Sequence, residues 1–385
     1  MKNSLYLNET RHSTWLELFF HLIFFVALGK VTHLFAHTHN NELDSRIFLT
    51  FVILFLPFWW IWVLHTSFSN RFDNDSRFHR IFTLLIMFVL IILSTTIDSG
   101  IDNNYSVFLM VYGVAKIITA GLYAKDIQKI KGRSINGLII GVLAFGTLLA
   151  LSGIFFSYKI AALLLTFSIV IEIIIIQTTL NSKNSTKPVD KEHLVERIGL
   201  LAIVLLGESI ASLTSSLTKV DWTILTIATG LVGFVIIAMI WWIYFDSLNL
   251  LIESKRDKYG TGIIYSQLLV YMSFTLIANT IRHAILNDLN IFEFRILAIS
   301  GMLLLYIGKQ TAYAINIPEN GKYRIINTLI VLGIATASLL LERVQYILFG
   351  MAFSFAIYIV LNYKTQMKLY GKVNFRVLFR HFHYH

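Results

Sequence analysis

A series of apolar runs, each as long as a membrane-spanning helix, occupies most of this 385-residue chain. A helix needs about 20 apolar residues to cross a bilayer core, and the sequence has twelve such stretches. Their approximate bounds are 14–36, 47–68, 80–97, 105–125, 135–153, 158–180, 194–217, 222–246, 262–285, 292–314, 324–341 and 345–363. The runs are continuously apolar, whereas the strands of a membrane barrel would alternate. The sequence therefore predicts an all-α integral membrane protein with about twelve transmembrane helices.

The connections between these runs are too short to hold a soluble domain. With 56% hydrophobic and only 14% charged residues, the composition excludes a cytosolic enzyme with a polar surface. The chain has no cysteine, which excludes disulfides, thiolate nucleophiles and cysteine-ligated metals. Its formal net charge of +10 comes from cations in short loops, where membrane topology and anionic lipid explain them. We therefore expect the lipid bilayer as a partner and no nucleic acid.

The loop cations predict the orientation of the chain. One set of alternate connecting segments, with both tails, holds 23 Lys and Arg residues, and the other set holds 4. Because cytoplasmic loops carry the excess of positive charge, both termini are predicted to be cytoplasmic. The first run lacks a small-residue cleavage site, so we expect a retained span and no signal peptide.

Cysteine labelling tests this topology without background, because the native chain has no cysteine. In intact cells, an impermeant thiol reagent should label the variant Asp102→Cys and leave Asn74→Cys unlabelled. The physical reason is that position 74 lies in a basic loop, whereas position 102 lies in a connection without Lys or Arg. The reverse labelling pattern would contradict the predicted orientation.

Two segments of the chain match each other at a shift of about 180 residues. Trp59 to Trp62 read Trp-Trp-Ile-Trp, and Trp241 to Tyr244 read Trp-Trp-Ile-Tyr, an offset of 182. A second match, offset by 178, pairs Leu28 to Lys30 with Leu206 to Glu208. These matches predict two parallel six-helix repeats, residues 1–190 and 191–385, of the kind found in transporters. The alternative for the tryptophans is a belt at the membrane interface.

Ionisable residues inside the runs are the informative ones, because each costs roughly 2.5–3.5 kcal/mol to insert. Such a side chain normally faces the protein interior or a wet cavity. The candidate transport residues are Glu17, His21, Lys30, Lys116, Glu172, Glu196, Arg197, Glu208, Asp246 and Lys309. Glu17 and His21 are four positions apart and share a helix face. The alternative for Glu17 is that it simply reaches water at the end of its span.

Glu208 lies eleven positions after Arg197, or about 16 Å along a helix at 1.5 Å per residue. This spacing places it near the middle of the membrane. Ser212 and Ser215 continue the same polar face. A polar stripe can hold helices together or line a pathway, and a carboxylate at this depth favours the pathway.

Lys116 is also predicted near the midplane, and Lys309 is its plausible counterpart in the second half. A buried lysine without an acid tends to lose its proton, so Lys116 needs a carboxylate nearby. Glu172 is a candidate, although its position also allows it to reach the membrane surface by extending its side chain.

The connection between the second and third runs alternates charges over a few residues. Asn70, Arg71, Asp73 and Arg80 form a candidate cytoplasmic hinge held by salt bridges. A solvated loop is the alternative. The segment lacks the Gly-x-x-x-Asp-x-x-Gly-Arg pattern of major facilitator transporters.

No motif for catalysis, nucleotide binding or a cofactor occurs in the sequence. His-x-His pairs in one loop and in the carboxyl tail lack acidic partners at metal spacing, so we predict no metal site. We therefore expect neither an enzyme nor a cofactor. The oligomeric state stays open, with a homo-oligomer as one option.

Four motifs in order along the chain carry a family resemblance. They are the segments 14–20 (Thr-Trp-Leu-Glu-Leu-Phe-Phe), 70–73 with Arg80 (Asn-Arg-Phe-Asp), 196–199 with 206–209 (Glu-Arg-Ile-Gly and Leu-Gly-Glu-Ser) and 241–246 (Trp-Trp-Ile-Tyr-Phe-Asp). The chain resembles the bacterial low temperature requirement protein A family. The resemblance implies a multi-span protein of the bacterial inner membrane, without an established substrate or reaction. The family usually has Asp after the Glu-Leu-Phe-Phe run, where this chain has His21.

Midplane charges of both signs, twelve spans and no nucleotide-hydrolysing motif favour a secondary transporter of a small solute or ion, coupled to protons through Glu208. The alternative is an ion or proton channel, because the Phe-Phe-acid pattern of the first span is loosely similar to that of lysosomal potassium channel relatives. His21 in place of the acid weakens that alternative. A membrane enzyme acting on lipids would need a dense cluster of acids or histidines at one interface, which the sequence lacks.

Overall fold

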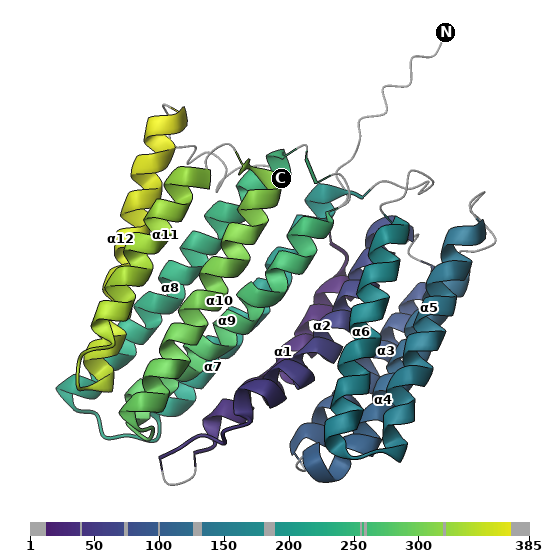
Figure 1. Ribbon diagram of the computed structural model, residues 1–385, viewed down its shortest axis with the longest axis horizontal. Helices are drawn as coiled ribbons and strands as arrows, with labels where there is room; N and C mark the ends of the chain where they lie inside the picture. The colour runs from purple at the N-terminus through teal and green to yellow at the C-terminus, as the bar shows by residue number, and fades with distance from the viewer. Residues whose placement is uncertain are drawn as a thin grey trace. The chain divides into compact units, whose positions relative to one another are not determined.

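The computed structural model describes residues 13–38, 41–72, 76–98, 101–125, 133–180, 189–254, 256–257, 260–318 and 321–370. These residues form twelve α-helices and two short 3-10 segments, with no β-strand (Figure 1). Each predicted run coincides with one helix. Eleven of the helices are long and apolar enough to cross a membrane. The remaining helix, α11 (Gly321–Ser338), has 18 residues and carries Lys322, Arg324 and Asn327 in its first turns, which lower its hydropathy.

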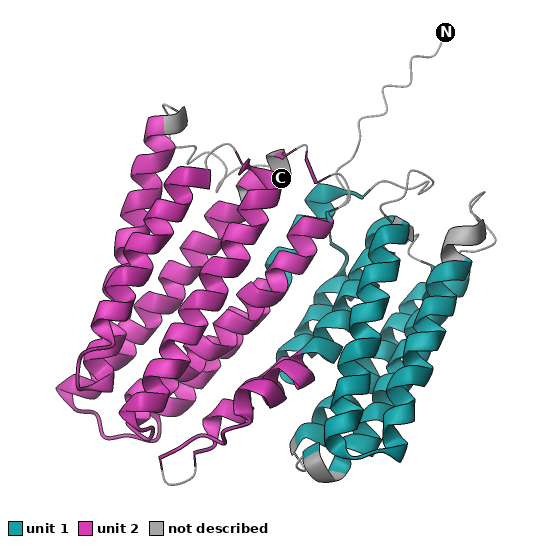
Figure 2. Ribbon diagram, in the orientation of Figure 1, with its two compact units in different colours: residues 1–27, 56–201, 258–260 teal, residues 28–55, 202–257, 261–385 magenta. Residues whose placement is uncertain are grey.

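The chain divides into two compact units (Figure 2), and three helices contribute to both. These three are α1 (Trp15–Thr32), α2 (Ile47–Phe72) and α7 (Lys191–Leu217). Unit 1 comprises residues 1–27, 56–201 and 258–260, and unit 2 comprises residues 28–55, 202–257 and 261–385. The bounds of the two units follow from which residues pack together. The predicted division at residue 190 instead separates two copies of an internal repeat, which the packing units do not test. The repeat therefore stays a prediction.

Unit 1 is an α-helical bundle in which helices that follow one another in sequence pack side by side. Its complete helices are α3 (Arg77–Asp98), α4 (Ile101–Lys125), α5 (Arg133–Ser152) and α6 (Tyr158–Leu180). The 3-10 turn Gly153–Phe155 joins the last two and packs against α4 and α6. The amino-terminal part of α1, the second part of α2 and the start of α7 complete the unit.

Unit 2 is a second bundle, in which α9 packs closely on α10 and α12 packs on α8 and α11. Its complete helices are α8 (Ile224–Glu253), α9 (Thr261–Leu286), α10 (Ile291–Asn316), α11 and α12 (Val344–Tyr370). The Thr223 capping box starts α8 and the Asn290 side chain caps α10, because these side chains accept hydrogen bonds from free N–H groups of the first turn. The 3-10 turn η1 (His33–Ala36) packs against α9.

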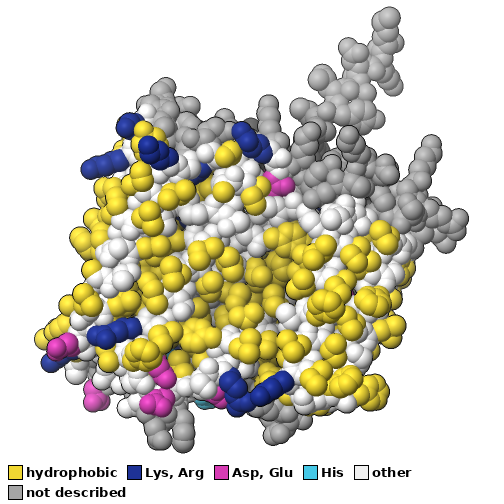
Figure 3. All heavy atoms as spheres, viewed as in Figure 1, with side chains coloured by type: hydrophobic (Ala, Val, Ile, Leu, Met, Phe, Trp, Pro, Cys, Tyr) yellow, Lys and Arg dark blue, Asp and Glu magenta, His cyan; other side chains and the backbone are white. Residues whose placement is uncertain are grey.

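The outward faces of both units carry large apolar side chains. Leu148 on α5, Leu163 on α6 and Leu231 on α8 are 69%, 70% and 63% exposed. On the visible face of unit 2, charged side chains gather toward the ends of the helices and the middle is mostly uncharged (Figure 3). Water would penalise such exposed apolar surface, so these faces fit a hydrocarbon surrounding.

The two tryptophan doublets have different environments. Trp59, Trp60 and Trp62 of α2 are at most 1% exposed, whereas Trp241 and Trp242 of α8 are 41% and 44% exposed. The interfacial belt is therefore wrong for the first group, whose indole rings pack inside unit 1.

Candidate functional site

A buried ion pair joins α1 to α7 in unit 1. Glu17 and Arg197 pair through side chains that are both 0% exposed. The second carboxylate oxygen of Glu17 accepts hydrogen bonds from His193 Nε2 at 3.3 Å and from the Thr14 backbone N–H at 2.8 Å. Such charge-assisted bonds compensate the loss of hydration. The alternative that Glu17 simply reaches water is therefore wrong.

Arg197 also fixes the protonation of a histidine on α2. Its guanidinium donates to His65 Nδ1 at 3.1 Å. Because a guanidinium has donors only, His65 Nδ1 must accept and its proton lies on Nε2. That nitrogen donates to Thr83 Oγ1 at 3.1 Å. His65 is therefore neutral in this arrangement, and Arg197 supplies a permanent positive charge in contact with Glu17.

His21 belongs to the same network and forms hydrogen bonds through both of its ring nitrogens. The Trp62 indole N–H donates to His21 Nε2 at 3.2 Å, and His21 Nδ1 donates to the Glu17 backbone carbonyl at 2.6 Å. One ring nitrogen thus accepts a hydrogen bond and the other donates one, which fits a neutral imidazole. A carboxylate at position 21 could not donate to that carbonyl.

Part of the predicted cytoplasmic hinge lies within the residues that the structure describes. Asn70 donates through Nδ2 to the Asp190 carbonyl at 2.8 Å and accepts from the Asp190 N–H at 3.1 Å. This pair ties the end of α2 to the segment before α7. Arg71 is buried in α2 and Arg80 is exposed on α3. Asp73 lies outside the described residues, so the salt-bridged hinge stays a prediction.

A second buried ion pair lies among α2, α4 and α6 of unit 1. Lys116 pairs with Glu172, and their side chains are 0% and 1% exposed. The Trp60 indole N–H donates to the same Glu172 oxygen at 2.5 Å. The alternative that Glu172 extends to the membrane surface is therefore wrong. The two side chains compensate each other inside the bundle, so this pair holds α4 and α6 together rather than offering a charge to a ligand.

Gly146 of α5 makes room for this ion pair, and substitution there tests the packing. A Cβ at Gly146 would overlap the carboxylate of Glu172, whereas a Cβ at Gly141 meets no atom within 4 Å. We expect Gly146→Ala to destabilise the protein by about 1–3 kcal/mol through overpacking. Gly141→Ala should be neutral or slightly stabilising, because alanine favours the helix. Thermal unfolding of both purified variants measures the difference, and equal melting temperatures would contradict the described packing.

Glu208 of α7 has a different environment, in unit 2. Its residue is 7% exposed, and a Cβ on Gly29 of α1 would lie only 3.1 Å from its Oε2. Its described ion-pair partner is His33, whose Nε2 lies 3.9 Å from Oε1 and whose side chain is 59% exposed. Lys30 is half-buried and forms no described ion pair with Glu208.

Two further predicted acids each accept a hydrogen bond from an uncharged N–H group. Glu196 accepts from the Ser13 backbone N–H at 3.1 Å in unit 1. Asp246 of α8 accepts from the Trp242 indole N–H at 3.1 Å in unit 2. Lys309 of α10 is 6% exposed and interacts with Asp246 only through longer-range attraction. The predicted residues therefore do not form one site: Glu17, His21 and Arg197 lie in one network, Lys116 pairs with Glu172, and the others have separate contacts.

Sequence reasoning missed several members of these groups. His65 is a histidine inside an apolar run, so the cost of polar groups in lipid could have identified it. His193 stands at the edge of a predicted run and gives no such signal. Trp60 and Trp62 were considered only as part of the repeat or of an interfacial belt, yet a buried indole N–H requires an acceptor. Here the acceptors are Glu172 and His21.

Eleven apolar helices with compensated charges buried between them define a multi-pass helical membrane protein. The chain matches the family described as bacterial low temperature requirement A protein (LtrA) over residues 12–362. It therefore belongs to this family, as the four motifs indicated. It is also similar to an uncharacterized protein, RA0937, of Rhizobium meliloti (strain 1021), with 20% identity over 312 residues, covering 76% of this chain and 75% of the relative.

Proposed function

We propose that this protein is a secondary transporter of a small solute or ion, driven by protons that bind Glu208. The observation that carries the proposal is the contrast among the three most buried intramembrane acids. Glu17 is in contact with Arg197, and Glu172 is in contact with Lys116. Glu208 instead faces His33, an imidazole with an exposed side chain.

A carboxylate that couples proton movement must release and bind its proton during the cycle. A neighbouring arginine or lysine at contact distance would hold it ionised, which makes Glu17 and Glu172 poor carriers. Histidine can change its own charge near neutral pH, so the pair of Glu208 and His33 can share or lose a proton without leaving a fixed charge behind. Ser209 and Ser212, buried on the same helix, add polar groups next to Glu208 along α7.

The location of the protein forms part of the proposal. We place it in the bacterial inner membrane with both termini in the cytoplasm, on the basis of the loop cations. An inward proton gradient is available there as the energy source, and the chain contains no nucleotide-hydrolysing motif that would offer another.

Reconstitution in liposomes tests this function. Purified protein is exposed to pools of sugars, amino acids, organic acids and inorganic ions under an imposed pH gradient, and internal pH is followed with a trapped dye. A transporter gives proton entry only with certain pools, and the initial rate saturates with concentration. Proton or ion flux that needs no added solute and rises linearly with driving force would instead favour a channel.

A further inference from the structure

Lys309 of α10 is a buried lysine that contacts no carboxylate in the part of the chain that the structure describes. Its Nζ donates one hydrogen bond, to the Ile243 carbonyl of α8 at 3.1 Å, although an ammonium group has three donors. The same carbonyl oxygen also accepts from Ser247 Oγ at 2.5 Å. Among the described residues, no carboxylate lies at ion-pair distance from Lys309, in contrast to Lys116, which contacts Glu172.

The neighbours of Lys309 do not supply the missing charge. Asp246 attracts it and Arg324 repels it, both from longer range, and these two effects oppose each other. The rings of Tyr358 and Tyr313 lie 4.8 Å and 5.5 Å from Nζ, so cation–π attraction recovers part of the lost hydration. A positive charge in such a site still favours a bound anion.

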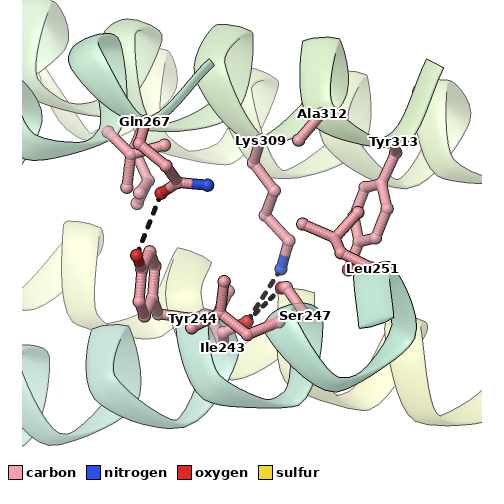
Figure 4. A pocket seen from close by; sticks show the side chains of 11 residues that line it. Ile243, Tyr244, Ser247, Leu251, Gln267, Lys309, Ala312 and Tyr313 are labelled. Carbon is pink, nitrogen blue, oxygen red and sulfur yellow. Dashed lines mark hydrogen bonds between the residues drawn. The ribbon is translucent and has the colours of Figure 1, made fainter. Parts of the chain in front are cut away.

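A small cavity lies beside this lysine in unit 2. Its volume is about 20 Å³, which is room for one water molecule or an ion of similar size and too little for an organic solute. Lys309, Ser247, Tyr244 and Gln267 line it together with Tyr313 and aliphatic side chains (Figure 4). The apolar walls lower the local dielectric and strengthen attraction between charges.

Gln267 adds a second donor to the cavity. Its Oε1 accepts from the Tyr244 hydroxyl at 3.0 Å, and its amide nitrogen is a further donor. Figure 4 shows this nitrogen turned away from Tyr244, on the side of Lys309. Lys309 and Gln267 thus each bring a hydrogen-bond donor to the lining of this otherwise largely apolar cavity, and such donors suit an anion.

We propose that the cavity between α8, α9 and α10, lined by Lys309 and Gln267, binds one small monovalent anion of chloride size. The ion would supply the negative charge that Lys309 lacks and accept a hydrogen bond from the Gln267 amide. This binding site does not rest on the proposed transport function, because it requires only the described packing of unit 2.

Equilibrium dialysis with radioactive chloride tests the site on the full-length protein in detergent, at constant ionic strength kept with sodium gluconate. We expect one saturable chloride site in the wild type. Lys309→Met should weaken it at least tenfold. Lys159→Met removes a lysine charge from an exposed position of α6 and should leave binding unchanged.

A second variant keeps the test decisive if Lys309→Met does not fold. Gln267→Glu is nearly isosteric, retains the acceptor for Tyr244 and places a carboxylate in the cavity, so it should abolish chloride binding in a folded protein. Saturable binding that persists in folded Gln267→Glu or Lys309→Met would overturn the proposal. Absence of saturable binding in the wild type would also overturn it and would assign the cavity to a water molecule. Because dialysis involves no gradient, a failed transport assay leaves this result unaffected.

Discussion

Replacing Arg197 with methionine should destabilise the protein by about 3–5 kcal/mol, because it leaves the Glu17 carboxylate buried without its cation. The loss should be large because both side chains are 0% exposed, so the carboxylate that remains is not in contact with bulk water. The same change also removes the donor to His65 Nδ1. Melting temperature and monodispersity of the purified variant in detergent measure the effect. Arg77→Met, at an exposed position of α3, is the matched control and should have little effect.

A double-mutant cycle separates the ion pair from general damage. Glu17→Gln alone should also destabilise, since Arg197 then keeps an uncompensated charge. Combining Glu17→Gln with Arg197→Met removes both charges, so the double variant should be more stable than the sum of the single effects predicts. Strictly additive effects would show that the two groups do not interact, against the described contact.

Glu208→Gln should abolish solute movement driven by a proton gradient while the protein still folds and inserts. Glutamine retains the size of the side chain next to Gly29 and cannot bind or release a proton. If Glu208 serves only to couple solute movement to proton movement, exchange of solute across the membrane without a gradient should persist. The readout is gradient-driven uptake and gradient-free exchange of one solute in the same proteoliposomes.

The matched control for this variant lies on the same helix. Glu192→Gln makes the identical chemical change at an exposed position of α7 and should transport like the wild type. If well-folded Glu208→Gln protein retains full gradient-driven uptake, Glu208 has no coupling role and serves the packing of α7 against α1.

The number and approximate ends of the helices could be predicted from the sequence because continuous apolar runs have few structural options in a membrane. α11 marks the limit of that reasoning, since its amino-terminal polar residues shorten its apolar part. The two packing units could not be predicted, because α1, α2 and α7 each contribute to both. Periodicity along one helix does not reveal which neighbours that helix meets at each end.

The sequence pointed to the intramembrane charged residues, but among their partners it offered only Glu172 for Lys116. The cost of burying charge identified Lys116 and Glu172, and the structure brings them together. The same rule gave Glu17 and Arg197 but could not pair them, because 180 positions separate them. Their histidine and indole partners depend on hydrogen-bond geometry, which the sequence does not contain.

The steady-state ratio of internal to external solute in proteoliposomes tests the proposed transport most directly. Under an imposed inward proton gradient, a solute identified by the pooled screen should accumulate inside above its external concentration. A protonophore should return the ratio to its equilibrium value, because coupling through Glu208 is then without a driving force. A ratio that never exceeds equilibrium, with or without the proton gradient, would contradict secondary active transport and leave passive conduction as the activity.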